Sequence, residues 1–351
     1  MTSSRVDDSP ATEAELPPRS LIPVIDFSPF LYGSAAEKQA TASAILKAFQ
    51  TSGFIYLAKH GIAPATVEDV FATSAKFFTR PQEQKDGLQW TTPESNRGYV
   101  AHGREKVSQL ADRDQVEALR SQNPDLKESM EIGKDGVPGR PNRWPDELDD
   151  EGKHFKTVMQ QFFRTCKDLN IQIMRALALG MGLGESYFDE YTDGGDNNLR
   201  LLHYPATPKE VFAKNKGQVR AGEHSDYGSI TLLFQDARGG LQVCGPNGTF
   251  LDATPIPGTI VINAGDLLAR WSNDTIKSTR HRVIEPPIPA GADGIYPPRY
   301  SVAYFCNPNF EKFIEVLPGT YDDHGVGVKG EKKYDGINSG QYLVQRLAAT
   351  Y

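Results

Sequence analysis

The second half of the chain consists of short apolar runs separated by turn residues, and this pattern constrains the fold more than any other feature. Six runs have the length and composition of β-strands, at residues 199–204, 229–234, 241–243, 259–263, 281–285 and 299–305. Turns that contain glycine or proline stand between them, at residues 239–240, 246–248 and 257–258. Many short strands at this spacing predict a jelly roll or a barrel.

The first half of the chain has helical periodicity instead. Apolar residues recur every three or four positions in three segments, at residues 35–51, 64–78 and 155–181. Short strands are predicted at 22–27 and 53–57, and a last helix at 339–349. Residues 79–150 are rich in proline, glycine and charge and predict loops and short helices, with a lid or pocket wall over 86–150. The predicted fold class is therefore α+β, and mostly β.

Composition and charge limit the classes of partner. The 38 basic and 45 acidic residues give a net charge of −7, which argues against a nucleic-acid or anionic-membrane surface. The sequence contains no run of 18 apolar residues, and its polar N-terminus lacks the apolar core of a signal peptide. The three cysteines lie far apart and form no C-x-x-C motif, so they indicate neither a zinc site nor a set of disulfides, and a reducing compartment is expected. We therefore expect a cytoplasmic protein with no membrane partner and a flexible tail at residues 1–20.

Two residues of the segment Gly222–Gly228 are suited to bind a metal ion. His224 and Asp226 point to the same side of an extended segment, so both can reach one point. Hydrogen bonding within a turn is the alternative interpretation of this pair. A third ligand must come from another strand, and His281 begins a predicted strand 55 residues after Asp226. Two imidazoles and one carboxylate on one face of the ion leave three positions open, which favours iron(II).

An arginine lies in the last predicted strand, where an unpaired positive charge would be costly. The apolar residues 302–305 indicate that this strand is buried. Arg299 and Ser301 share one face of the strand. A guanidinium beside a hydroxyl binds a carboxylate through charge-assisted hydrogen bonds. The pair therefore predicts a site for an anionic ligand.

These residues form an ordered pattern of H-x-D, 54 residues, H, 17 residues and R-x-S. The pattern is similar to that of the 2-oxoglutarate/iron(II) oxygenase superfamily, in the branch of isopenicillin N synthase. Ile22-Pro-Val-Ile-Asp26 and residues 53–61 resemble the first two strands of that branch. Leu202-His-Tyr-Pro205 resembles its co-substrate strand.

The resemblance implies a fold and a division of the chain. The catalytic core would be a double-stranded β-helix, or distorted jelly roll, at residues 197–310. Helices and strands of residues 21–185 would flank it on the N-terminal side, and a helical region of residues 311–351 on the C-terminal side. All of these would form a single oxygenase domain over residues 21–351.

The resemblance also implies the cofactors. Iron(II) would be held by three ligands, His224, Asp226 and His281, with O₂ and 2-oxoglutarate as co-substrates. Arg299 and Ser301 would hold the far carboxylate of 2-oxoglutarate, with Tyr204 as a further partner. Oxidation of the substrate would then release succinate and CO₂.

Longer stretches resemble the fungal thymine 7-hydroxylases, at residues 91–99, 200–205, 218–224, 263–272 and 342–351. That family oxidises the methyl group of thymine stepwise to an alcohol, an aldehyde and a carboxylate, so the resemblance implies a free pyrimidine base as substrate. Four residues would bind it: Asn96, Arg200, Tyr227 and Phe305. A ring or guanidinium plane can stack on a flat base, and an amide can both donate to it and accept from it.

Each of these four residues also has an interpretation without a ligand. Asn96 could shape a turn, and Arg200 could pair with an acid such as Asp196. Tyr227 and Phe305 could be core residues. The sequence also leaves the oligomeric state open.

Three other functions remain open at this point. The first is a 2-oxoglutarate-dependent oxygenase of the same branch that acts on an amino acid or a fungal secondary metabolite. The second is an enzyme of the same fold that does not depend on 2-oxoglutarate, in which the Arg299–Ser301 pair binds a substrate carboxylate instead. The third is a non-catalytic binding protein, against which the intact metal and arginine pattern argues.

Overall fold

The computed structural model describes residues 22–104, 124–215, 217–322 and 330–350, and the predicted tail at residues 1–20 lies outside them. The described helices are α1 (Ser28–Tyr32), α2 (Ala35–Thr51), α3 (Pro64–Phe78), α4 (Gln82–Asp86), α6 (Asp150–Gly180), α7 (Asp189–Thr192), α8 (Lys209–Lys214), α9 (Asp266–Trp271) and α10 (Ser339–Thr350). None of these helices has the length and hydropathy needed to cross a membrane.

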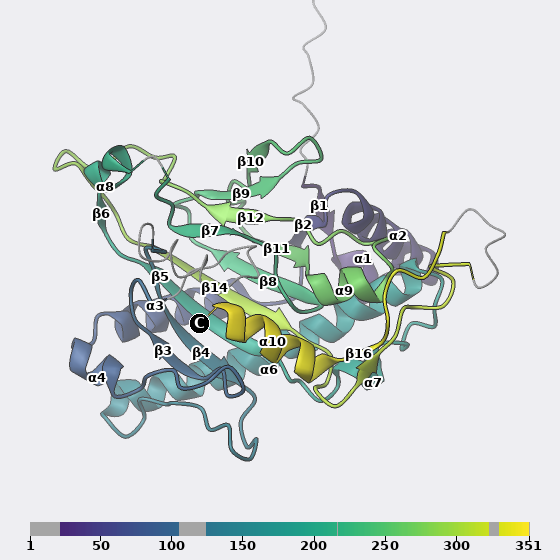
Figure 1. The fold of residues 1–351 in the computed structure, drawn as a ribbon, viewed down its shortest axis with the longest axis horizontal. Helices are drawn as coiled ribbons and strands as arrows, with labels where there is room; N and C mark the ends of the chain where they lie inside the picture. Colours follow the sequence, from purple (N-terminus) through teal and green to yellow (C-terminus); the bar gives the residue numbers. More distant parts are fainter. Residues whose placement is uncertain (1–21, 105–123, 216, 323–329, 351) are drawn as a thin grey trace, which may run out of the picture.

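The described strands form two large sheets (Figure 1). The larger sheet has the order β1 (Val24–Asp26), β2 (Phe54–Ala58), β11 (Thr259–Ala264), β8 (Ile230–Gln235), β14 (Arg299–Cys306), β5 (Asn198–Tyr204), β4 (Glu128–Gly133) and β3 (Gly98–Val100). The smaller sheet has the order β10 (Phe250–Asp252), β9 (Leu241–Cys244), β12 (His281–Val283) and β7 (Ala221–His224). Two short ribbons pair β13 (Ile295–Tyr296) with β6 (Thr207–Pro208) and β15 (Phe313–Ile314) with β16 (Ile337–Asn338).

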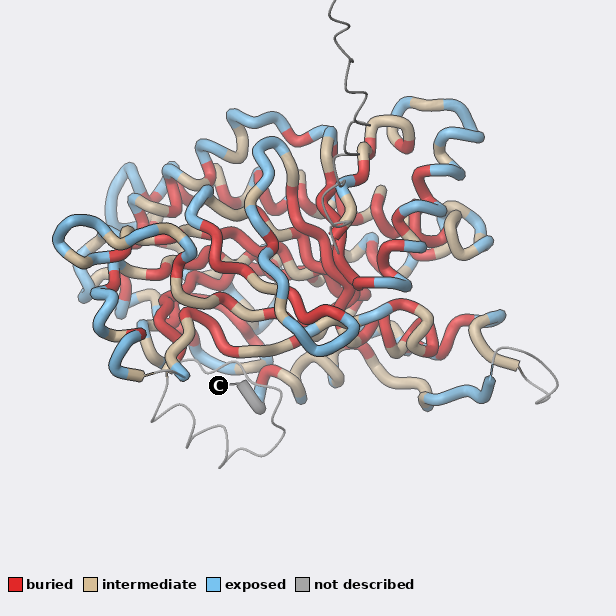
Figure 2. The backbone as a smooth tube through the Cα atoms, turned by 90° about the horizontal axis from the view of Figure 1, so that it is seen from above, coloured by how far each residue is buried: buried red, intermediate tan, exposed pale blue. Residues whose placement is uncertain are grey.

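The larger sheet separates two hydrophobic cores. Successive side chains of a strand point to opposite faces, and on β14 this sends Val302 and Tyr304 into the core shared with the helices. Ala303 faces the other way, into a smaller core that also contains Val243 and Val283 of the second sheet. The buried residues therefore concentrate where the central strands run side by side (Figure 2). The space between the two sheets is where polar side chains of β14 and β5 also point.

Helices α2, α3 and α6 pack on the outer face of the larger sheet. The N-terminus of α2 is fixed by a capping box, in which Ser34 and Glu37 satisfy each other's backbone N–H groups. Helix α6 begins five residues before the predicted start at residue 155, because Asp149 caps it by accepting a hydrogen bond from the Gly152 backbone N–H at 2.7 Å. The first turn of α6 is polar, so apolar periodicity did not reveal it.

The prediction for residues 79–150 was wrong in one respect. Strands β3 and β4 lie in this segment, although the sequence predicted only loops and short helices there, and β4 is fully buried within the larger sheet. Each face of β4 carries one acidic side chain in an ion pair: Glu128 contacts Lys85 at 2.9 Å and His203 at 2.7 Å, and Glu131 contacts Arg200 at 2.7 Å. Because Met130 and Ile132 are the only large apolar residues of this strand and acidic residues stand beside them, hydropathy gave no signal for it.

The other predicted elements are confirmed. The helices predicted at 35–51 and 64–78 have the observed bounds, and the last helix ends one residue later than predicted. The six predicted strands of the second half correspond to β5, β8, β9, β11, β12 and β14. The fold class is α+β with extensive sheets, as predicted.

The packing of α6 on the larger sheet generates a stability prediction. Phe162 of α6 is buried and meets the ring of Phe234 on β8 edge to face, with ring centroids 5.1 Å apart. Phe162→Ala should lower the free energy of unfolding by about 3–5 kcal/mol, as large core truncations do. Urea denaturation measures this, with the exposed neighbour Gln161→Ala as a control expected within about 0.5 kcal/mol of wild type. Equal stability of the two variants would contradict the assigned packing.

Candidate active site

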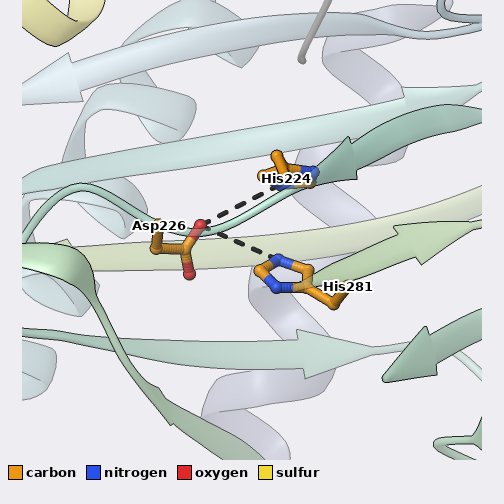
Figure 3. Close-up of side chains that lie close together, drawn as sticks. All are labelled: His224, Asp226 and His281. Atoms are coloured by element: carbon orange, nitrogen blue, oxygen red, sulfur yellow. Dashed lines mark ion pairs between the residues drawn. The ribbon is translucent and has the colours of Figure 1, made fainter. Parts of the chain in front are cut away.

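Two histidines face each other across the smaller sheet. His224 ends β7 and His281 begins β12, and the two residues are directly opposite partners in the antiparallel pair. Their ring centroids lie 4.3 Å apart. Asp226 follows β7 by two residues, so the extended chain directs its carboxylate to the same point (Figure 3). The predicted convergence of these three side chains is therefore observed.

The spacing of the three side chains suits a shared ion. Asp226 Oδ1 lies 4.0 Å from His224 Nε2 and 3.8 Å from His281 Nε2, which is too far for hydrogen bonds. The three ligand atoms all lie within 4.8 Å of one another. The atoms thus surround one point instead of satisfying each other. Among the described residues, no other group of three histidine, cysteine or acidic side chains has this arrangement.

Hydrogen bonds to the other polar atoms of these side chains fix the direction of the atoms that face the shared point. The second carboxylate oxygen of Asp226, Oδ2, accepts hydrogen bonds from Thr231 Oγ1 at 2.5 Å and Asn263 Nδ2 at 2.6 Å, which leaves Oδ1 for a metal ion. The Nδ1 atoms of His224 and His281 lie 2.7 and 3.3 Å from the backbone oxygens of residues 222 and 279. A proton on each Nδ1 directs the lone pair of Nε2 to the shared point.

The ionisation states also suit metal binding. Burial, followed by the neighbouring His281, lowers the pKa of His224 to about 4. Burial alone would raise the pKa of Asp226, but the two histidines and the hydrogen bonds from Asn263 and Thr231 lower it below its usual value. At neutral pH the site therefore offers a neutral imidazole and a carboxylate without loss of a proton. Two imidazoles and one carboxylate fit iron(II).

The predicted anion site lies in the same pocket, on β14. Arg299 and Ser301 are both buried. The guanidinium donates to the Ser301 hydroxyl at 3.2 Å and to the backbone oxygen of Gly239 at 2.9 Å. It also lies 4.9 Å from the centre of the Tyr204 ring, on the neighbouring strand β5. Arginine, serine and tyrosine therefore form one buried, positively charged patch.

The predicted substrate residues line the same pocket. Arg200 stacks on Phe305 at 5.2 Å from the ring centre, and its guanidinium pairs with Glu131 at 2.7 Å. An acidic partner was the alternative interpretation of Arg200, but the acid is Glu131 of β4 and not Asp196. Asn96 has a left-handed backbone, with φ at 46°, so it also shapes a turn.

All ten predicted site residues line this one pocket, and strand register sets the order of those on β14 and β5. Arg299 is paired with Tyr204 at one end of the β14–β5 ladder, and Phe305 is paired with Asn198 at the other. Six residues of extended chain span about 20 Å. The positively charged patch and the ring-stacking residues thus lie at different ends of the pocket floor.

Sequence reasoning missed several residues that line the pocket, among them Lys127, Asn198, Leu343 and Leu347. Asn198 could have been found, because it lies two residues before Arg200 and shares its strand face. Leu343 and Leu347 lie four residues apart on α10 and share one helix face, but no pattern showed where that helix docks. Lys127 precedes β4, the strand that hydropathy did not reveal.

Comparison with known proteins agrees with this geometry. Residues 195–308 match the 2OG-Fe(II) oxygenase superfamily, and residues 22–147 match the family of the N-terminal region of non-haem dioxygenases in morphine synthesis. The 2-oxoglutarate-Fe(II) type oxidoreductase ppzD of Metarhizium rileyi is 33% identical over 340 residues, which cover 95% of this chain and 92% of the relative. The chain belongs to the 2-oxoglutarate/iron(II) oxygenase superfamily. It is a 2-oxoglutarate-dependent dioxygenase, as the sequence predicted.

Other relatives differ in the substrates that their names state. The proline hydroxylase buaE of Petromyces alliaceus is 33% identical over 333 residues, which cover 93% of this chain and 98% of that protein. A crystal structure of full-length Neurospora crassa thymine 7-hydroxylase in complex with alpha-KG and thymine is 62% identical and superposes with a TM-score of 0.85. That match covers 94% of this chain and 97% of the Neurospora chain.

The metal triad generates a prediction about metal binding. His281→Ala should weaken Mn(II) binding by at least about tenfold, since even loss of a ligand's hydrogen-bond partner costs that much, and should abolish turnover. The stabilisation of the protein by added Mn(II) measures binding, because an ion that binds only the folded state raises the melting temperature.

His154→Ala serves as the control, since His154 is an exposed histidine distant from the triad in sequence. It should retain both metal stabilisation and turnover. Full activity of His281→Ala would refute the assignment of His281 as a ligand.

Proposed function

We propose that this dioxygenase hydroxylates the methyl group of thymine and oxidises it stepwise towards uracil-5-carboxylate. The observation that carries the proposal is the makeup of one pocket. It combines the triad of His224, Asp226 and His281, a buried arginine–serine pair and a set of side chains suited to a flat base. Similarity over almost the whole chain to Neurospora crassa thymine 7-hydroxylase, which binds alpha-KG and thymine, supports the same substrate.

Iron(II), together with 2-oxoglutarate and O₂, would supply the oxidising chemistry at the triad and yield succinate and CO₂. Arg299 and Ser301 would hold the far carboxylate of 2-oxoglutarate. A buried guanidinium is stabilised more by a charge-assisted hydrogen bond to an anion than by hydrogen bonds to neutral groups. The Tyr204 ring beneath the guanidinium would fix its plane. The chain's own task is thus to orient two small molecules beside the ion and to exclude water.

The other end of the pocket floor complements a pyrimidine base. Phe305, Arg200 and Tyr227 supply planar groups on which a base can stack. Asn96 accepts a hydrogen bond from Trp90 through Oδ1, so its amide N–H₂ is the group that it can offer to a base carbonyl. The Oδ1 atom of Asn198 is buried and has no hydrogen-bond partner among the described residues. A ring N–H of thymine would satisfy that acceptor.

The finer description of the fold follows from the family. We propose that the two facing sheets are the distorted jelly roll of this superfamily, with the core at residues 197–310 in one oxygenase domain over 21–351. Strands β7, β12, β5 and β14, which carry the proposed ligands, all lie within that core. A cytoplasmic location and the lack of nucleic-acid or membrane partners stay predictions from composition.

A second candidate substrate class comes from the relatives. Proteins about one-third identical over nearly the full chain include a proline hydroxylase, so the same scaffold carries out reactions on amino acids. The fold and the metal site would be the same for both functions, because a few pocket residues determine which substrate binds.

The testing experiment measures succinate formed by the purified, iron(II)-loaded protein from 2-oxoglutarate, with and without thymine. We expect succinate to rise with thymine, together with oxidised 5-substituted uracils detected by mass spectrometry. The His281→Ala protein is the matched control and should form neither product. Succinate that rises with proline or another amino acid but not with thymine would overturn the proposed substrate in favour of the second candidate.

The 2-oxoglutarate site generates its own prediction. Arg299→Ala should raise the KM for 2-oxoglutarate roughly 10- to 100-fold, because it removes a charge-assisted contact of about 1.5–3 kcal/mol. The KM for thymine should change much less. Arg299→Lys keeps the charge but loses the forked geometry, so it should lie between Ala and wild type. Steady-state kinetics with each co-substrate varied in turn give both constants, and an unchanged KM for 2-oxoglutarate would refute this role.

A further inference from the structure

The C-terminal helix α10 forms part of the active-site pocket. Leu343 and Leu347 of α10 line the pocket together with residues of β14, β5 and β7. In Figure 1, α10 is drawn in yellow in front of β14. One further side chain of the same helix, Arg346, does not line the pocket but contacts a residue that does.

Arg346 joins α10 to the loop that carries the metal ligand Asp226. Its guanidinium lies 4.4 Å from the centre of the Tyr227 ring. Its Nη1 atom lies 2.8 Å from Asp266 Oδ2 and donates to the Tyr342 hydroxyl at 3.2 Å. Tyr227 immediately follows Asp226 and lines the pocket. One arginine therefore covers the ring that the proposed substrate would meet.

Asp266 extends this connection to the metal site. The Asp266 carboxylate accepts a hydrogen bond from the Ser225 hydroxyl at 3.0 Å and one from the Ser278 hydroxyl at 2.6 Å. Ser225 lies between the two proposed metal ligands in the sequence. Its backbone N–H donates to the backbone oxygen of Asp226 at 2.7 Å, and the next N–H donates to that of Tyr227 at 3.1 Å. Helix α9, which Asp266 begins, thus holds the ligand loop and α10 at the same time.

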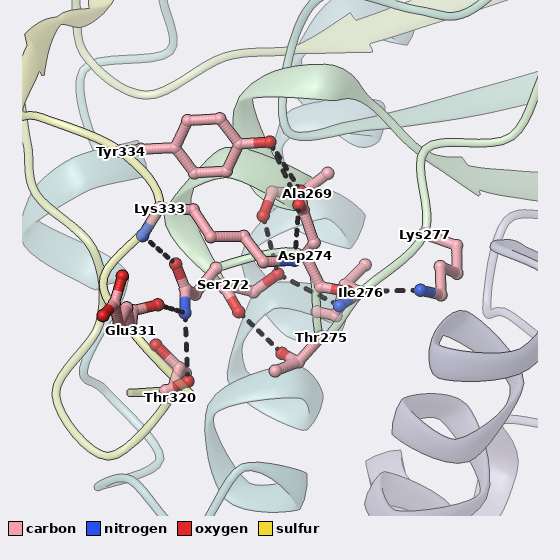
Figure 4. Close-up of polar contacts among 11 residues, drawn as sticks. Ala269, Ser272, Asp274, Thr275, Ile276, Lys277, Thr320, Glu331, Lys333 and Tyr334 are labelled. Carbon is pink, nitrogen blue, oxygen red and sulfur yellow. Dashed lines mark hydrogen bonds and ion pairs between the residues drawn. The ribbon is translucent and has the colours of Figure 1, made fainter. Parts of the chain in front are cut away.

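The turn after α9 anchors the segment that leads into α10. Asn273 and Asp274 have left-handed φ values of 53° and 63°, which asparagine and aspartate tolerate better than most residues. Asp274 binds the Lys333 ammonium and the Tyr334 hydroxyl, each at 2.9 Å (Figure 4). Arg270 of α9 lies over the Tyr334 ring at 4.8 Å. The start of α9 thus contacts α10 itself, and the end of α9 with the turn after it holds the segment that precedes α10.

We propose that Arg346 is a positioning residue that orients the Tyr227 ring for stacking on the substrate base. This inference rests on the proposed function. The guanidinium covers one face of the ring through a cation–π contact and is itself fixed by the Asp266 carboxylate. The Tyr227 ring then cannot turn away from the pocket without losing the contact with Arg346.

The test compares Arg346→Ala with wild type in the iron(II)-loaded, full-length protein. The KM for thymine should rise roughly 3- to 30-fold, the range for loss of a partly buried cation–π contact. The KM for 2-oxoglutarate should stay within about twofold, because Arg299 and Ser301 are untouched. The ratio of succinate formed to thymine oxidised should also rise, since a loosened pocket consumes 2-oxoglutarate without oxidising the base.

Two further variants separate positioning from general stability. Gln345→Ala changes the neighbour on the same helix and should leave both KM values at wild-type level. Arg346→Lys keeps a cation beside Asp266 but loses the flat guanidinium, so it should recover part of the thymine KM. Equal effects of Gln345→Ala and Arg346→Ala would overturn the proposal, because both would then act through helix stability.

A double-mutant cycle with Tyr227→Ala identifies the route of the effect. If Arg346 acts through Tyr227, adding Arg346→Ala to Tyr227→Ala should raise the KM for thymine less than about twofold further. Full multiplication of the two effects would overturn the proposal. A wild-type protein that does not oxidise thymine would overturn the proposed function and this role with it. Wild-type turnover of thymine with an unchanged KM in Arg346→Ala would overturn this role alone.

Discussion

The alternation of side chains along β14 is the constraint on which the rest of the structure depends. This strand lies between β5 and β8 in the larger sheet, so the backbone groups on both of its edges form hydrogen bonds with neighbouring strands. Its two faces carry different kinds of side chain. One face carries apolar residues into the core with α6. The other presents Arg299, Ser301 and Phe305 to the space between the sheets. A shift of one residue in register would exchange these faces and destroy both the core and the pocket.

A buried pocket of this kind contains more charge than a protein core normally tolerates, and the charges are arranged in pairs. Glu131 meets Arg200, and Lys127 meets the fully buried Asp125 at 2.9 Å. Within the described part of the chain, the hydrogen-bond partners of Arg299 are all neutral: a hydroxyl, an amide oxygen and a backbone oxygen. An anionic co-substrate at that position would complete the pairing, which links the stability of the pocket to the binding of its ligand.

The sequence predicted most of the fold because helices and strands follow local periodicity. It predicted the metal site because the order and spacing of its histidine, aspartate and arginine residues resemble those of a known family. The i and i+2 spacing of His224 and Asp226 and the long stripe of α6 follow from strand and helix geometry alone. Strand β4 was not predicted, because it has only two large apolar residues and its acidic side chains pair with residues distant in sequence. The docking of α10 could not be predicted either, since it depends on Asp266 and on left-handed residues after α9. The acid that binds Arg200 was predicted in kind but not in position for the same reason.

The two sheets divide the work of the pocket between them. The smaller sheet and its loop carry His224, Asp226 and His281, whereas most of the other side chains that line the pocket come from β5, β14 and α10. Natural selection can therefore alter one wall of the pocket while the opposite wall keeps its ligands. Substitutions on β5 or α10 would then change the shape of the substrate end of the pocket while the three proposed metal ligands stay as they are.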